Sequence, residues 1–144
     1  MDYFNAFAIS ASGMAVEKTR LDVTALNLAN ASSTRAGGKL YEPLTVLSAP
    51  RGAGRFEQLF QAAGLPFQGV EVVAIKPSGA PPRLVHEPGH PDADERGFVA
   101  YPAINPVKEM MTIITATRAY EANLSALSAA RTMAQRALEI GGNS

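Results

Sequence analysis

Apolar residues recur at intervals of three and four in two segments, one at each end of the chain. This spacing places apolar side chains along one side of an α-helix. It predicts a helix over residues 4–30 and another over residues 106–140. The residues between them hold nine of the ten prolines and most of the glycines, which interrupt regular structure. We therefore expect a mainly α fold in which two long terminal helices pair antiparallel, as in a coiled coil, around a small irregular β insert.

The first helical segment has one apolar stripe, interrupted by Lys18. Asn30 follows the stripe and precedes a Ser-Ser-Thr run, so we expect it to end the helix in a left-handed conformation. The stripe is the candidate packing surface of this segment and consists of Phe4, Phe7, Ala11, Met14, Leu21, Ala25 and Leu28.

The last segment begins with Asn105-Pro106, a pair typical of a helix N-cap and first turn. Its second flank, which includes Ala116, Ala130 and Ile140, is also apolar, so we expect this helix to need more than one neighbour. The main apolar positions form a near-heptad seam, which we predict to mediate helix packing and assembly: Met110, Ile113, Thr117, Tyr120, Leu124, Leu127, Ala134 and Leu138.

The middle of the chain changes to short runs with the period of β-strands. Proline near most of these runs favours small sheets with limited pairing. Residues 50–64 have no clear period, although Phe56, Leu59 and Phe60 could form one helical turn. We predict three parts: residues 1–36 and 105–144 as the helical stem, and residues 37–104 as the insert. The four predicted strands are Pro43–Ser48, Gly69–Lys76, Arg83–His86 and Phe98–Tyr101.

Composition excludes several classes of function. The chain of 144 residues has 13 basic and 13 acidic side chains, so it has no positive surplus for binding nucleic acid. It has no cysteine, which excludes disulfides and thiolate metal sites. No apolar run reaches the length of a membrane span. The first basic residue, Lys18, follows the apolar N-terminal stretch, so a cleaved signal peptide is not expected.

The residues from His86 to Gly97 are the strongest candidate for chemistry, because they contain both histidines and several carboxylates. Pro88 and Pro91 prevent the helical display that two-histidine zinc sites use. A calcium loop beginning at Asp92 fails at its fifth and twelfth positions, Arg96 and Ala103. We therefore expect a structured polar loop, without a metal or another cofactor.

Nucleophilic catalysis has no support, since the chain lacks a Gly-x-Ser-x-Gly elbow. We therefore expect that the protein is not an enzyme. Asn27, Asn30 and Asn123 are polar residues within the apolar helical segments. They either cap or face solvent, or they are buried amides that fix the register between helices. The sequence leaves both interpretations open.

Three stretches make the chain resemble the axial rod and hook proteins of the bacterial flagellum. The first contains the hallmark Asn27, Leu28, Ala29 and Asn30. The second resembles a loop that distinguishes a proximal-rod protein from its relatives, and it contains Pro88, Gly89, His90, Pro91, Asp92 and Asp94. The third lies in the C-terminal helix and includes Tyr120, Glu121 and Asn123. The resemblance covers about half of the chain, and residues 49–68 match nothing in the family.

The resemblance implies a structural subunit of the proximal rod, which crosses the periplasm as the drive shaft that transmits motor torque for swimming. It implies export through the flagellar type III apparatus without a cleaved signal. The implied partners are copies of the chain, other rod proteins and ring-adapter components at the rod base. Neither nucleic-acid binding nor direct membrane insertion is expected. The alternatives are a neighbouring rod subunit and, in a different class, a cytoplasmic coiled-coil adaptor.

Overall fold

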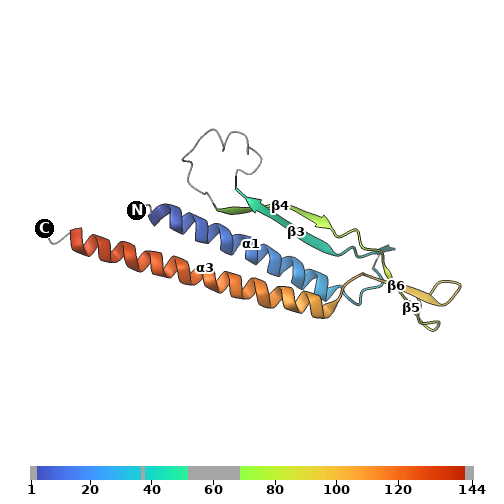
Figure 1. Cartoon of the computed structure of the whole chain (residues 1–144). Coiled ribbons are helices and arrows are strands. Elements are labelled where there is room, and N and C mark those ends of the chain that lie inside the picture. Colours follow the sequence, from blue (N-terminus) through green and yellow to red (C-terminus); the bar gives the residue numbers. More distant parts are fainter. Residues whose placement is uncertain (1–2, 37, 52–68, 142–144) are drawn as a thin grey trace.

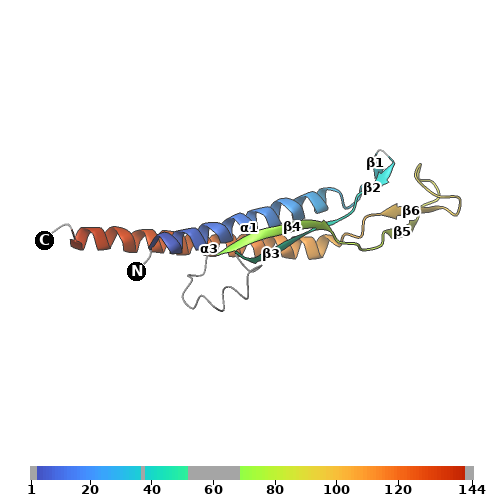
Figure 2. The ribbon, with the colours of Figure 1, turned by 90° about the horizontal axis from the view of Figure 1, so that it is seen from above.

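The structure, a computed structural model, describes residues 3–36, 38–51 and 69–141. Two long helices form its stem: α1 (Tyr3–Ala29) and α3 (Pro106–Gly141). They lie side by side and antiparallel, so α1 begins and α3 ends towards the same end of the stem, and α3 extends beyond the start of α1 (Figures 1 and 2). The predicted helix pair and the mainly α fold class are confirmed. Neither helix is long and apolar enough, over the described residues, to cross a membrane.

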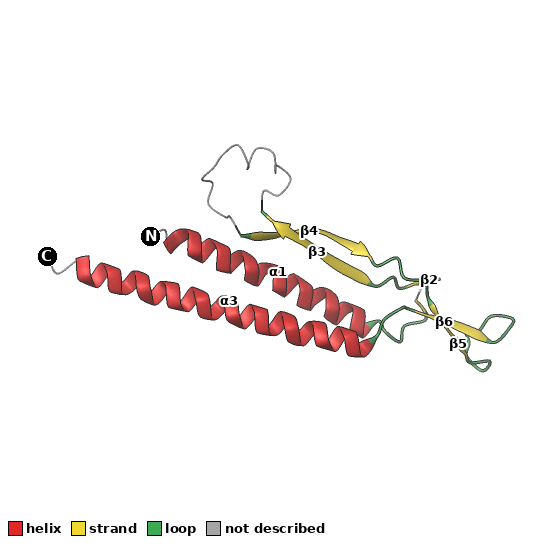
Figure 3. Cartoon of the chain, in the orientation of Figure 1, coloured by secondary structure: helices red, strands yellow, loops and turns green. Residues whose placement is uncertain are grey.

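Over the described residues, the segment between the helices forms three separate antiparallel sheets of two strands each, and the β3–β4 and β5–β6 pairs are seen in Figure 3. The four predicted strands are confirmed, two with shifted ends, whereas the short β1–β2 hairpin was not predicted. The strand pairs are β1 (Arg35–Ala36) with β2 (Lys39–Leu40), β3 (Leu44–Pro50) with β4 (Val70–Pro77), and β5 (Arg83–His86) with β6 (Phe98–Tyr101). The helical turn suggested at Phe56–Phe60 lies outside the described residues.

Helix α1 lies between two neighbours. Helix α3 packs on one side, and the β3–β4 hairpin runs along the other side (Figure 1). The β5–β6 hairpin extends beyond the end of the stem, away from the chain termini (Figure 3). The molecule is therefore elongated, and of the two helices it is α1 that is covered on two sides.

The end of α1 and the start of α3 both face the insert. Their terminal backbone groups find hydrogen-bond partners in different ways. Asn105 caps α3 as predicted, because its side-chain oxygen accepts hydrogen bonds from the backbone N–H of Val107 at 3.0 Å and of Lys108 at 3.3 Å. Asn30 does not adopt the predicted left-handed conformation. The last turn of α1 tightens instead, since the Asn30 N–H donates to Asn27 at 3.1 Å and that of Ala31 to Leu28 at 3.2 Å. The Asn30 side chain also donates to the Leu26 carbonyl at 2.9 Å.

The buried apolar residues form a thin core in two places. Val16 and Val23 of α1 are buried within the stem. Val99 of β6 and Pro102 are fully buried, and Ile104 is nearly so, where the insert joins the stem. Much of the remaining apolar surface stays exposed, and most of the exposed large apolar residues belong to the two helices.

Candidate assembly interface

The seam between the two helices uses small side chains of α3. Ala116 and Ala130 are its buried apolar residues, with 1% and 5% of their surfaces exposed. Gly13 of α1 lies directly against the Asn123 side chain, so that a Cβ atom at Gly13 would approach Asn123 Oδ1 to 2.8 Å. Small residues on both sides let the helix backbones approach closely. The seam within one molecule is therefore narrow and alanine-rich.

The predicted near-heptad positions of α3 are exposed to different degrees in the single chain. Ile113, Leu127 and Ala134 are half-buried. The other five positions are exposed: Met110, Thr117, Tyr120, Leu124 and Leu138. Their role in packing between molecules stays a prediction.

The predicted stripe of α1 is divided in a similar way. Phe7, Met14, Leu21 and Leu28 are half-buried, whereas Phe4, Ala11 and Ala25 are exposed. The most buried side chains of α1 lie at other positions, and several are polar: Ser12, Val16, Val23, Thr24 and Asn27. Helix α1 contacts two neighbours, and each takes a different face of the helix. One stripe of large apolar residues could not have revealed that arrangement.

Large apolar side chains remain exposed on several sides of α3. Several are more than half exposed, including Met111 at 64% and Ile114 at 54%. They do not form a single row, because Leu124 and Met133 are about two and a half turns apart and lie on opposite sides of the helix. Isolated exposed apolar residues are common on protein surfaces, whereas so many on one helix favour contacts with other chains. We call this set the outer face of α3, and it consists of Val107, Met110, Met111, Ile114, Tyr120, Leu124, Met133, Leu138 and Ile140.

Polar side chains attach the β3–β4 hairpin to α1. Ser12 Oγ accepts a hydrogen bond from the Val70 N–H at 3.1 Å and donates to the Ile9 carbonyl at 2.7 Å. Gly69 adjoins this contact with a φ of 87°, and a Cβ atom there would overlap Ser12 Oγ. The hairpin is thus fixed where β4 begins.

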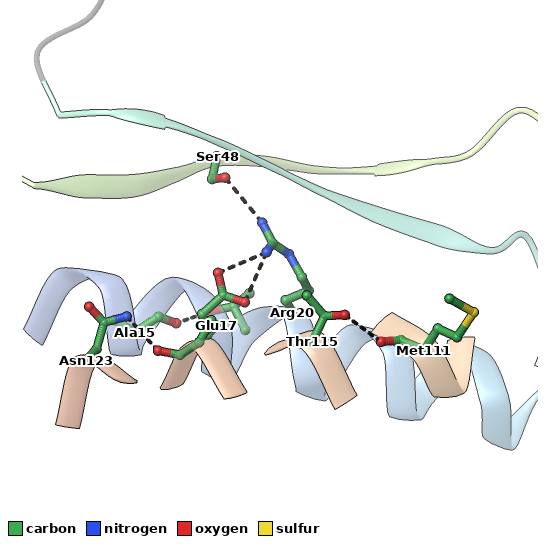
Figure 4. A network of polar contacts seen from close by, with 9 residues as sticks. Ala15, Glu17, Arg20, Ser48, Met111, Thr115 and Asn123 are labelled. Carbon is green, nitrogen blue, oxygen red and sulfur yellow. Dashed lines mark hydrogen bonds and ion pairs between the residues drawn. The ribbon is translucent and has the colours of Figure 1, made fainter. Parts of the chain in front are cut away.

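Arg20 provides a second attachment in the middle of the hairpin (Figure 4). Its guanidinium pairs with the Glu17 carboxylate at 2.9 Å and reaches Ser48 Oγ of β3 at 3.5 Å. The strand register shifts at this point, between Leu47 and Ser48. The ion pair is partly buried, with 33% of the Arg20 side chain and 14% of the Glu17 side chain exposed, and it holds the guanidinium towards Ser48.

Asn27 provides the third attachment, where β3 begins. Its Nδ2 donates to the Leu44 carbonyl at 2.9 Å, and its Oδ1 accepts from the Leu44 N–H at 2.9 Å. Oδ1 also accepts from the Tyr41 hydroxyl at 2.8 Å, and Nδ2 lies 3.4 Å from Glu109 Oε2 of α3. Burial, and then the negative charge of Glu109, raises the pKa of Tyr41. Asn27, only 3% exposed, therefore links α1, β3 and α3.

The three asparagines thus have different surroundings. Asn27 is a buried amide between elements, as one of the two interpretations required. Asn30 closes its own helix. Asn123 donates to the Ala119 carbonyl at 2.9 Å within its helix and faces Gly13 across the seam.

The loop between β5 and β6 is ordered by its own polar side chains. Asp94 Oδ1 accepts hydrogen bonds from the backbone N–H of Arg96 at 2.9 Å and of Phe98 at 2.8 Å. His90 Nδ1 accepts from the Asp92 N–H at 3.0 Å. These contacts are typical of side chains that stabilise turns. In the part of the chain that the structure describes, no three potential ligands gather as a metal site would require.

Two further contacts connect this loop to its surroundings. The Thr34 hydroxyl donates to Asp92 Oδ2 at 2.6 Å, which ties the loop to the segment after α1. The Tyr101 hydroxyl donates to Glu87 Oε2 at 3.0 Å, and this hydrogen bond raises the pKa of Tyr101. The loop residues singled out by sequence therefore shape a projecting hairpin.

Sequence reasoning missed Ser12 and Arg20 as structural residues. Ser12 is one of several serines in a helical segment, and only its burial distinguishes it. Their spacing with Asn27, at eight and seven residues, corresponds to about two helical turns each. That spacing of polar residues within an apolar helix was the available signal.

Comparison with known proteins adds an independent observation. The family model described as the C-terminal part of the flagellar basal body rod FlgEFG proteins matches residues 95–140. The chain is 39% identical over 142 residues to the flagellar basal-body rod protein FlgC of Aquifex aeolicus, covering 96% of this chain and 97% of that protein. It is 37% identical to the FlgC protein of Salmonella typhimurium and 34% identical to that of Bacillus subtilis, with 98% of this chain and 99% of each relative covered.

Proposed function

This chain belongs to the FlgC family of flagellar basal-body rod proteins, and we propose that it is a structural subunit of the bacterial flagellar rod. In this proposal many copies of such subunits form the shaft that transmits motor torque. The observation that supports it most is the outer face of α3, because nine large apolar side chains of this helix stay between 36% and 80% exposed in the single chain. The proposal assigns the chain no catalytic role.

The outer face would pack against neighbouring subunits. Burying apolar surface stabilises by roughly 25 cal/mol per Å², and this gain offsets the loss of rotational and side-chain freedom on association. An antiparallel stem with apolar residues exposed on several sides of α3 suits a subunit that is surrounded by similar subunits. Close-packed contacts also deform little, as transmission of torque requires.

Finer details of the proposal come from the resemblance between the sequence motifs of this chain and those of the flagellar rod and hook proteins. We infer a place in the proximal rod, with copies of the chain, other rod proteins and ring-adapter components as neighbours. We also infer passage through the type III export apparatus without cleavage. The packing and family-motif residues named from sequence remain the proposed contact residues, with the outer face of α3 foremost among them.

Cysteine labelling tests the proposal, because the chain has no cysteine of its own. Leu124→Cys lies on the outer face and Ser78→Cys lies in an exposed part of the insert. Both introduced thiols should react with a maleimide in the free chain. In purified basal bodies the thiol of Leu124→Cys should be protected, whereas that of Ser78→Cys should still react.

Equal labelling of the two variants in basal bodies would overturn the assignment of the outer face. Absence of the chain from purified basal bodies would overturn the rod assignment itself. Cell fractionation addresses the remaining alternative, since a coiled-coil adaptor would stay in the cytoplasm.

A further inference from the structure

We propose that Asn27 sets the register of α1 against both of its neighbours, because its side-chain amide binds the backbone of a strand as another strand would. The inference concerns a single chain and is independent of how chains assemble. It assigns a physical role to one residue of the Asn27–Asn30 hallmark.

The contact between Asn27 and Leu44 reproduces one step of a β-ladder. The amide donates to the Leu44 carbonyl and accepts from the Leu44 N–H, both at 2.9 Å. Among short side chains only asparagine offers a donor and an acceptor side by side. Aspartate of the same shape offers acceptors alone, and leucine offers neither.

The remaining bonding positions of the amide are also occupied. Tyr41 donates to Oδ1 at 2.8 Å, and Glu109 lies 3.4 Å from Nδ2. Oδ1 thus accepts two hydrogen bonds and Nδ2 offers two, which is the full capacity of a carboxamide. The partners come from the segment before β3, from β3 itself and from α3. The Asn27 side chain can reach all of these partners together at only one position of α1 along its axis.

A shift of α1 by one helical turn moves Asn27 about 5.4 Å along the axis. The amide and the Leu44 backbone would then be buried without partners. Such groups are costly in protein interiors. The contact between Gly13 and Asn123, near the other end of α1, specifies the same antiparallel register. Apolar contacts with alanine distinguish poorly between neighbouring registers, so this polar contact supplies the selectivity.

The test compares variants of the full chain, at a concentration where sedimentation shows a monomer. Asn27→Asp keeps the shape of the side chain, removes both donors, and places a carboxylate beside Glu109. We expect the folding equilibrium constant from urea unfolding to fall by about 10- to 100-fold. Asn30→Asp is the matched control, since among the described residues Asn30 forms its hydrogen bonds with residues 26–33, and it should lower the constant by less than about 5-fold.

Adding Glu109→Gln to Asn27→Asp separates register selection from a general loss of packing. Glutamine can donate to the carboxylate introduced at position 27, so the double variant should recover the part of the lost stability that comes from the contact with α3, whereas the Leu44 carbonyl still lacks its donor. A general defect would not respond to a change on α3. If Asn27→Asp and Asn30→Asp lower the constant equally, or if Glu109→Gln restores nothing, the proposal is wrong.

Amide hydrogen exchange supplies a readout that does not require the Asn27→Asp variant to fold. Tyr41→Phe removes one of the four bonds and leaves the amide of Asn27 in place. We expect the Leu44 N–H to exchange about 3- to 10-fold faster in this variant. The Val70 N–H, which is bonded to Ser12 at the other end of the hairpin, should be unchanged. Equal acceleration at both amides would contradict a local role for the Asn27 contact.

Discussion

The two helices of the stem have similar apolar patterns but different surroundings. Helix α1 is packed by α3 on one side and by the β3–β4 hairpin on another, and it buries Val16, Val23 and several polar residues. Helix α3 packs mainly against α1, and its fully buried apolar residues are Ala116 and Ala130. Its larger side chains, such as Met111 and Ile114, face away from the molecule.

The difference shows that an apolar stripe does not by itself identify the inside of a molecule. In α3 the most buried apolar residues are two alanines, Ala116 and Ala130, whereas many of the larger apolar side chains are exposed, unlike in an ordinary amphipathic helix. This arrangement indicates that the seam within the chain is built for close approach, and that most apolar area is kept for other contacts. Four substitutions test that difference, in order of their expected effect on the free energy of unfolding.

Ala116→Asp should have the largest effect. It places a charge at a position that is 1% exposed between the helices. A buried, unpaired charge costs several kcal/mol, of the order of 3–5. Urea unfolding followed by circular dichroism measures the loss, with Ala122→Asp on an exposed side of α3 as the control. Equal stability of these two variants would mean that Ala116 is not buried between the helices.

Asn105→Ala should destabilise the chain by about 1 kcal/mol, because α3 loses the acceptor for two N–H groups in its first turn. The adjacent Pro106 keeps its favourable place at the first helical position. Differential scanning calorimetry measures the change. An unchanged melting temperature would mean that packing on α1 alone determines where α3 begins.

Tyr41→Phe should remove about 1 kcal/mol through the lost hydrogen bond to Asn27. It should also change the response to alkaline pH. The raised pKa of Tyr41 favours the protonated phenol in the folded chain, so its contribution is complete below the ordinary pKa of 10.0 and is lost as the pH rises through the folded value. The variant should lose less stability above pH 10 than the unchanged chain, which urea unfolding across that range would detect.

Ile114→Asp should change the free energy of unfolding least, by less than about 0.5 kcal/mol, since the side chain is 54% exposed. Its effect should be on assembly, because the charge would be buried between subunits. Soft-agar motility and electron microscopy of basal bodies measure that loss. Normal swimming of a cell whose only copy is this variant would place the contacts between subunits elsewhere.

The sequence predicted the helices and four strands because their periods are regular and their ends have local signals. Asn105 and Pro106 determine the start of α3 through contacts within three residues. The β1–β2 hairpin was missed because strands of two residues have no measurable period. The conformation of Asn30 was predicted wrongly because a tightened turn of N–H bonds ended the helix without a left-handed residue.

The arrangement of the interfaces was harder to predict. Whether Ala116 or Met110 faces α1 depends on how closely two backbones approach, and that distance is a property of the pair. The sequence identified Asn27 as a possible buried amide, but its main partner is the backbone of Leu44. Backbone N–H and C=O groups are the same in nearly all residues, so the sequence pattern does not indicate which backbone group a side chain will bind.

The antiparallel stem also has a consequence for synthesis on the ribosome. The residues that cover α1 on its helical side are made long after α1 itself, because α3 begins only at Pro106. Contacts between segments so far apart form slowly, and here they cannot form before α3 has been translated. A nascent chain must therefore remain open along α1 until α3 emerges, and a premature stop codon anywhere before α3 would leave the stem unclosed.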